Sequence, residues 1–183
     1  LIEKQKSISN KNYFLITEIK QIDEWIKEAE ETGELAVDTE TNSLDPHQAD
    51  LVGISLSSKV GKACYIPIGH KSSKCINKND VIKKLKPLLE DPSVKKIGQN
   101  IKFDFIVLFK QGIEMTSMED TMLMSYVLDA GKNRHNMDTL SEIHLGHKTI
   151  SFKEIVGTGK KEINFSEVAV SYTHLRAHET STY

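Results

Sequence analysis

The stretch Leu35-Ala36-Val37-Asp38-Thr39-Glu40 decides the fold class, because a short apolar run leads directly into two carboxylates. A run of this kind indicates a buried strand. Side chains alternate between the two faces of a strand, so Asp38 and Glu40 should point to the same side of a sheet, about 7 Å apart along the chain. Two carboxylates placed in this way can bridge two cations, whereas an isolated Asp-x-Glu is more often only a polar strand end.

The sequence on either side predicts a mixed sheet with helices. Short apolar runs predict strands at 13–16, 35–37, 51–56, 63–68 and 94–98, and the second to fourth of these suggest an antiparallel meander. Apolar spacings of three and four predict helices from Thr17 as N-cap to Gly33, and at 80–90, 100–112, 120–128 and 137–145. Pro87 should kink or split the second helix. This order of elements excludes a doubly wound Rossmann domain.

Bulk composition limits the function classes. The 183 residues suffice for one domain, and 24 basic against 26 acidic side chains exclude a polybasic nucleic-acid arm, so any nucleic-acid site must be local. No apolar run approaches the roughly 20 residues of a membrane-spanning helix, so no membrane contact is expected. Cys64 and Cys75 lack the spacing of a zinc site and fit a reducing compartment. We therefore expect a cytoplasmic protein.

Six short motifs occur in a specific order: VDTETNSL at 37–44, KPLLED at 86–91, GQNIKFD at 98–104, DTM at 120–122, RHNMDTL at 134–140 and HKTISF at 147–152. In this order and spacing, over roughly 13–169, they resemble the proofreading 3'-5' exonuclease domain of bacterial DNA polymerase I. DTE alone is a weak signal, but DTETxSL followed by GQNxKxD is specific. The resemblance implies an α/β ribonuclease-H-like fold, in which helices flank a mixed sheet with an antiparallel meander and parallel strands.

The resemblance also implies catalytic and metal-binding residues. Asp38 and Glu40 match the ligands of the tighter ion, and Asp38 also bridges to a second ion that Asp104 holds through water. The complete domain would thus hold two Mg²⁺ or Mn²⁺ ions. Without the resemblance, Asp104 is explained as a carboxylate in the first turn of a helix that Asn100 caps.

Contacts to single-stranded DNA are implied in the same way. The family's wedge between the terminal bases matches Leu44, which ordinary core packing would explain equally well. The remaining contacts map onto Gln99, Asn100, Lys102, Phe103, Arg134 and Phe152. The simpler explanation of Lys102 and Arg134 is a solvated surface charge, and that of Phe152 is core packing.

The implied activity is metal-dependent proofreading, which releases nucleoside monophosphates from the 3' end of single-stranded DNA. The implied partner is the polymerase domain of a parent chain, and a monomer is expected. One alternative is a ribonuclease-D-like RNA 3'-5' exonuclease. Another is a catalytically dead domain that only binds single strands.

The sequence departs from the family near residue 170. The family's third motif is a Tyr followed four residues later by Asp, but here Tyr172 is followed by Arg176. The segment 170–183 resembles translated sequencing adapter more than any polymerase. We therefore expect a lead-in at 1–12, an exonuclease domain at 13–169 that lacks its third motif, and a non-native tail at 170–183. Hydrolysis by this chain should be impaired.

Overall fold

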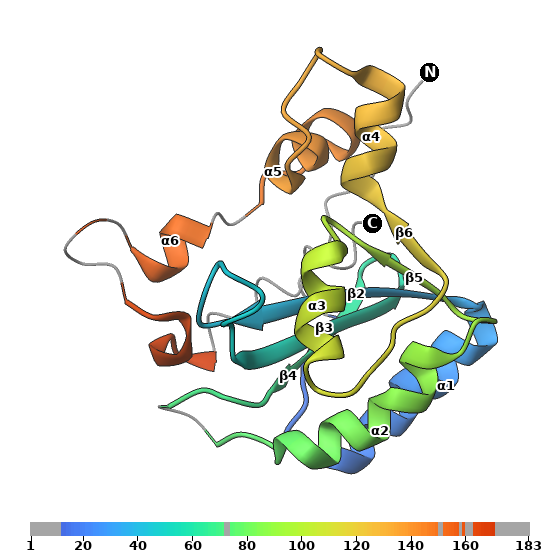
Figure 1. Cartoon of the computed structure of the whole chain (residues 1–183), viewed down its shortest axis with the longest axis vertical. Helices are drawn as coiled ribbons and strands as arrows, with labels where there is room; N and C mark the ends of the chain where they lie inside the picture. Colours follow the sequence, from blue (N-terminus) through green and yellow to red (C-terminus); the bar gives the residue numbers. More distant parts are fainter. Residues whose placement is uncertain (1–11, 72–73, 150–151, 158, 160–162, 171–183) are drawn as a thin grey trace.

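The fold is built on one mixed β-sheet (Figure 1). The computed structural model describes residues 12–71, 74–149, 152–157, 159 and 163–170. Within them the strands are β1 (Tyr13–Leu15), β2 (Glu34–Thr41), β3 (Leu51–Lys59), β4 (Lys62–Pro67), β5 (Lys95–Gly98) and β6 (Met118–Asp120). Their order in the sheet is β1-β4-β3-β2-β5-β6. The pairs β2·β3 and β3·β4 are antiparallel and the other pairs are parallel, which confirms the predicted meander and mixed sheet.

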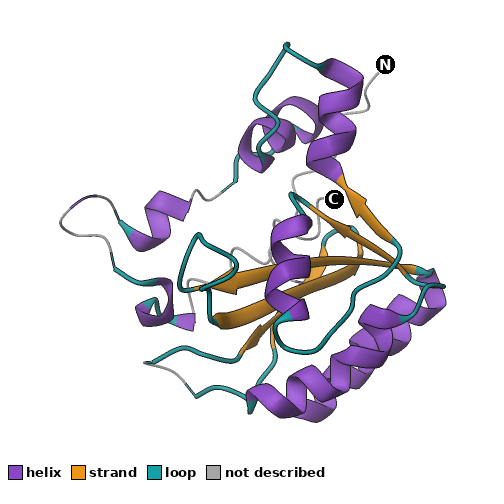
Figure 2. Cartoon of the chain, in the orientation of Figure 1, coloured by secondary structure: helices purple, strands orange, loops and turns teal. Residues whose placement is uncertain are grey.

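Helices lie around this sheet (Figure 2). They are α1 (Ile22–Thr32), α2 (Lys78–Glu90), α3 (Lys102–Phe109), α4 (Thr121–Asp129), α5 (Met137–Leu140) and α6 (Phe152–Val156). Three short pieces join them: 3₁₀ turns η2 (Ile19–Gln21) and η5 (Phe165–Glu167), and a π-helical turn η3 (Ser141–Leu145). In the described part of the chain, no helix is long and apolar enough to cross a membrane.

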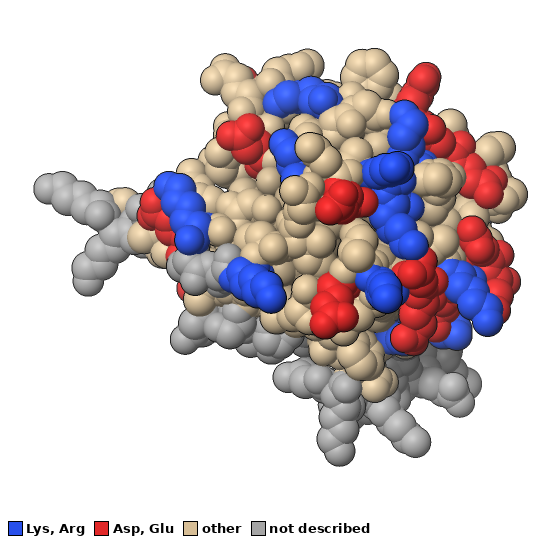
Figure 3. All heavy atoms as spheres, turned by 90° about the horizontal axis from the view of Figure 1, so that it is seen from below, with Lys and Arg blue, Asp and Glu red and all other residues tan. Residues whose placement is uncertain are grey.

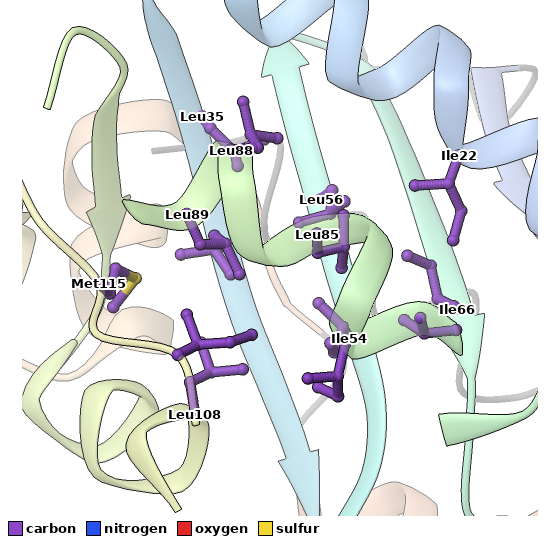
Figure 4. Close-up of a cluster of buried hydrophobic side chains, with 14 of the residues drawn as sticks. Ile22, Leu35, Ile54, Leu56, Ile66, Leu85, Leu88, Leu89, Leu108 and Met115 are labelled. Atoms are coloured by element: carbon purple, nitrogen blue, oxygen red, sulfur yellow. The ribbon is translucent and has the colours of Figure 1, made fainter. Parts of the chain in front are cut away.

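The main core lies between one face of the sheet and helices α1 to α3. In α2 the side chains of Val81, Leu85, Leu88 and Leu89 are buried, which is the spacing of one helix face. Figure 4 shows how leucines of α2 meet Leu35, Ile54 and Leu56 of the strands. Burying each such side chain contributes about 1.5–3 kcal/mol to folding.

The structure contradicts the expected N-cap of the first helix and the expected split of the second. Thr17 is not an N-cap: Gln21 Oε1 instead accepts from the backbone N–H groups of Thr17 (2.8 Å) and Glu18 (2.9 Å), and Glu18 is the cap of η2. The side chain of Gln21 reaches back and satisfies these amides in place of the threonine hydroxyl. Pro87 does not split α2, which runs as one helix through its last turn because the buried face on both sides of Pro87 holds it against the sheet.

Buried His70 makes folding stability depend on pH. Its Nδ1 lies 3.0 Å from the carbonyl oxygen of Val168 and its Nε2 lies 2.7 Å from Tyr65 Oη. A carbonyl can only accept, so Nδ1 carries the proton and Nε2 accepts from the tyrosine. Burial lowers the pKa of His70 below its ordinary value, since the charged form loses solvation.

We therefore expect the free energy of unfolding to fall as the pH drops below about 6.5, the pKa of an unfolded histidine. Below that pH the unfolded chain binds a proton that folded His70 resists. Urea denaturation at several pH values measures this slope. The slope should shrink in His70→Gln and persist in His47→Gln, because His47 is exposed. Equal slopes in both variants would contradict the assignment.

Candidate active site

A cavity of about 780 Å³ opens where β2 ends. It is lined by Asp38, Thr39, Glu40, Thr41, Asn42, Ser43, Leu44, Gln99, Asn100, Phe103, Asp104, Ile163, Asn164 and Phe165. The lining comes from three separate segments: the end of β2 with the loop after it, the turn from β5 into α3, and the segment before η5. All three predicted carboxylates and four of the predicted DNA contacts therefore share one cleft.

The sheet presents Asp38 and Glu40 on one face. Asp38 is half-buried and Glu40 is 7% exposed. Their neighbours on β3 are Ser55 and Gly53, and register partners point to the same face. Both neighbours are small, but at Gly53 the space on this face is already filled. A Cβ at Gly53 would meet the ring of Tyr65, so no larger side chain fits there.

Asp104 reaches the cleft from the first turn of α3 and is 3% exposed. Its Oδ1 accepts from the backbone N–H (2.8 Å) and from Oγ1 (2.6 Å) of Thr39. Burial, and secondarily the nearby charge of Asp38, raise the pKa of Asp104 well above its ordinary value, while the bonds from Thr39 act in the opposite direction. A bound cation would relieve this repulsion and favour the ionised carboxylate.

The carboxylates fit an open magnesium site. Among the described residues, no three His, Cys, Asp or Glu side chains lie close enough together to hold a metal ion by themselves, as a closed cage would. Mg²⁺ keeps several waters and is bound through one or two carboxylates plus substrate phosphate, so it needs no such cage. Asp38, Glu40 and Asp104 supply the oxygen ligands that Mg²⁺ or Mn²⁺ prefers. They are the residues that would hold an ion here.

Asp120 belongs to the DTM motif at 120–122, but the sequence did not reveal what its carboxylate does. Its carboxylate accepts from four backbone N–H groups: Asn100 (3.0 Å) and Ile101 (3.1 Å) before α3, and Met122 (2.9 Å) and Leu123 (3.3 Å) at the start of α4. It thereby holds the turn that delivers Asp104. The expectation that Asn100 is the N-cap of α3 is wrong. Asn100 adopts a left-handed conformation with φ 57°, and Ile101 takes the cap position.

Replacing Asp120 by alanine should therefore lower the free energy of unfolding by about 2 kcal/mol, since an N-cap and charge-assisted bonds to buried amides are lost together. Urea denaturation measures the change. The matched control is Asp23→Ala, which removes an exposed carboxylate paired only with Lys84 on the surface. Equal stability of the two variants would show that Asp120 does not hold this turn.

Gln99 lines the cleft, but its side-chain amide is hydrogen-bonded to other residues of the protein. Oε1 accepts from Thr121 Oγ1 (2.6 Å) and Nε2 donates to the carbonyl of His135 (2.7 Å). Gln99 thus ties the segment before α5 to the cleft, and this segment carries Arg134, which is exposed. The single-strand contact predicted for Gln99 remains a prediction.

The remaining predicted DNA contacts are placed differently. Phe103 lines the cleft, whereas exposed Lys102 lines a neighbouring apolar hollow beside α4. Phe152 begins α6, and its side chain lies outside the described part of the structure. Figure 3 shows acidic and basic side chains interspersed over the face seen from below, without a continuous basic surface there.

Leu44 is 87% exposed, so the core-packing explanation for it is wrong. Its loop is nevertheless anchored. Lys110 Nζ donates to the carbonyl of Ala49 (2.9 Å), and Asn164 Nδ2 donates to the carbonyl of Asn42 (3.1 Å). The loop thus presents an apolar side chain to solvent at the rim of an acidic cleft. The wall that includes Asn164 was not predicted, because its short segment carries no recognisable motif.

Known proteins resemble this chain in sequence over most of its length. A family model described as 3'-5' exonuclease matches residues 13–178. DNA polymerase I of Rhizobium leguminosarum is 42% identical over 91% of this chain, and that of Pseudomonas aeruginosa is 40% identical over 87%. In both cases the match spans only 18% of the relative's length.

Solved structures show the same fold. Ribonuclease D of Trypanosoma brucei matches with a TM-score of 0.71 at 12% identity, over 93% of this chain and 54% of that one. A structure of NrnC from Brucella melitensis with bound Mg²⁺ matches with a TM-score of 0.59 at 26% identity, over 81% of this chain and 66% of that one. The predicted ribonuclease-H-like fold is confirmed, and the chain belongs to the 3'-5' exonuclease domain family of bacterial DNA polymerase I.

Proposed function

We propose that this domain hydrolyses the terminal phosphodiester at the 3' end of single-stranded DNA and releases nucleoside monophosphates. The observation that carries the proposal is one cleft that is lined by Asp38, Glu40 and Asp104 and also by the exposed Leu44. An apolar wedge beside clustered carboxylates suits a substrate with a stackable base next to a phosphate. Partial substrates such as a base or a phosphate alone would use only half of this surface.

The residues that line the cleft have different roles in the proposed mechanism. Leu44 and Phe103 give the terminal bases apolar surfaces, and stacking on such surfaces tolerates any base. Asp38, Glu40 and Asp104 are the residues that would hold divalent cations. Bound cations supply Lewis acidity, which activates water and stabilises charge in phosphodiester hydrolysis. Thr39 and Asp120 keep the carboxylates in place.

The partner proposed from the relatives is the polymerase domain of a longer chain, because the match spans only 18% of each polymerase. A proofreading role then follows: the polymerase would pass a frayed 3' end to this cleft. The domain itself is proposed to act as a monomer, since all three carboxylates and the wedge come from one chain.

The test is hydrolysis of a 5'-labelled oligothymidine in Mn²⁺. We expect stepwise shortening from the 3' end, slow in this chain, and complete inhibition by EDTA. Oligouridine of the same length discriminates the RNA alternative, which is favoured by the structural similarity to ribonuclease D. Faster shortening of oligouridine would replace the DNA proposal, and binding of either strand without any shortening would favour the catalytically dead domain.

A further inference from the structure

The central strand β2 loses one of its neighbours just before the carboxylates. Its pairing with β5 runs from Glu34↔Lys95 to Ala36↔Ile97, and β5 ends at Gly98. Its pairing with β3 continues as far as Thr41. The edge of β2 that faced β5 therefore needs other partners beyond Ala36, because a buried backbone N–H without a partner costs free energy.

Asp104 takes the place that the missing strand leaves. Its Oδ1 accepts the backbone N–H of Thr39 at 2.8 Å and the hydroxyl of the same residue at 2.6 Å. Thr39 is 6% exposed and Asp104 is 3% exposed, so water does not compete readily for these bonds. One carboxylate oxygen is thus held from two directions by a single residue.

Two donors on one oxygen fix the rotation of the carboxylate as well as its distance. Asp104 lines the cleft, and its other oxygen receives no bond from Thr39. Thr39 also lies between Asp38 and Glu40 on the same strand, so one residue links the first pair of carboxylates to the third.

We propose that Thr39 is the positioning residue of this site, and that its hydroxyl orients Asp104 so that the third carboxylate faces a cation held by Asp38 and Glu40. This inference rests on the proposed function, since it presupposes a cation in the cleft. The backbone N–H alone would keep Asp104 near β2 but would allow it to rotate. Partners that orient metal ligands are commonly worth about 10–100-fold in metal affinity.

The experiment is calorimetric titration of the whole chain with Mn²⁺. Thr39→Val keeps the shape and the backbone N–H but removes the hydroxyl, and it should weaken Mn²⁺ binding about tenfold or more. Thr39→Ser keeps the hydroxyl and should bind close to the unchanged chain. Thr116→Val is the matched control, because it removes a threonine hydroxyl bonded to the carbonyl of Glu90, away from the cleft.

A double-mutant cycle separates positioning from a purely structural role. If Thr39 acts through Asp104, adding Thr39→Val to Asp104→Asn should weaken Mn²⁺ binding no further. Additive losses would overturn the proposal. Urea denaturation confirms that each variant is folded, and Thr39→Ala provides a second hydroxyl-free variant if Thr39→Val does not fold.

Two failures are distinguishable. If Asp38→Ala and Asp104→Asn bind Mn²⁺ like the unchanged chain, the proposed metal site itself is wrong. If both weaken binding while Thr39→Val matches Thr116→Val, the metal site stands and the positioning role of Thr39 is overturned.

Discussion

Replacing Asp38 by alanine should abolish Mn²⁺ binding and lower hydrolysis of single-stranded DNA by about a thousandfold or more. Asp38 lies on the same face of β2 as Glu40, and its charge acts on buried Asp104. Among the described residues that line the cleft, the other carboxylates are those of Glu40 and Asp104. The loss of Asp38 removes one of the three carboxylates of the cleft together with a negative charge that acts on Asp104.

Calorimetry with Mn²⁺ and a gel assay on labelled oligothymidine measure the two effects. Asp23→Ala again serves as the control, because it also removes one negative charge but lies exposed on α1. Glu40→Gln should give a loss in the same direction, since Glu40 lines the same cleft. Mn²⁺ binding that survives Asp38→Ala unchanged would remove the metal assignment from this cleft.

The sequence predicted those elements whose own side chains form a regular apolar pattern. Strands β2 to β5 and helices α1 to α3 follow from runs or spacings of buried residues, whereas α4 follows from a spacing of apolar residues that are not buried in the structure. Strand β6 was not predicted because it has no apolar run, whereas β1, which is equally short, follows from the run at 13–16. Helix α6 was not predicted because its 5 residues are too few to show a period. Their formation depends on neighbours such as β5, which pairs with β6.

The residues of the candidate site also differ in whether the sequence could predict them. Asp38 and Glu40 could be placed together from the alternation of one strand, and Asp104 could be joined to them only through the family resemblance. The roles of Thr39 and Asp120 could not be predicted, since each depends on hydrogen bonds to residues 65 and about 20 positions away. The lead-in and the non-native tail remain predictions, because residues 1–11 and 171–183 lie outside the described part of the structure.

The second large effect concerns the segment after Val170. Replacing 171–183 by a helix that carries a Tyr followed four residues later by Asp should raise hydrolysis of single-stranded DNA by a factor of roughly hundreds, because a further metal ligand is worth several kcal/mol in the transition state. The same oligothymidine assay measures it. In the present sequence Tyr172 is followed four residues later by Arg176 instead of Asp.

The fold explains why a helix joined at this point can reach the site. Val170 packs against Ala63 and Tyr65 of β4. Tyr65 is in register with Ser55, and Ser55 with Asp38, so these three side chains share one face of the sheet across neighbouring strands. Neighbouring strands lie about 4.8 Å apart. The strand on which Val170 packs, β4, is therefore roughly 10 Å from β2, the strand that carries Asp38.

A helix that continues from Val170 over this face would bring its polar side chains to the carboxylates across the small residues of β3. Versions of the new helix with Phe for the Tyr, or Asn for the Asp, separate the contribution of each group from that of the helix itself. Both should remain near the low rate of the present chain. Hydrolysis by the present chain that equals that of the complete replacement would instead show that Asp38, Glu40 and Asp104 suffice for the reaction.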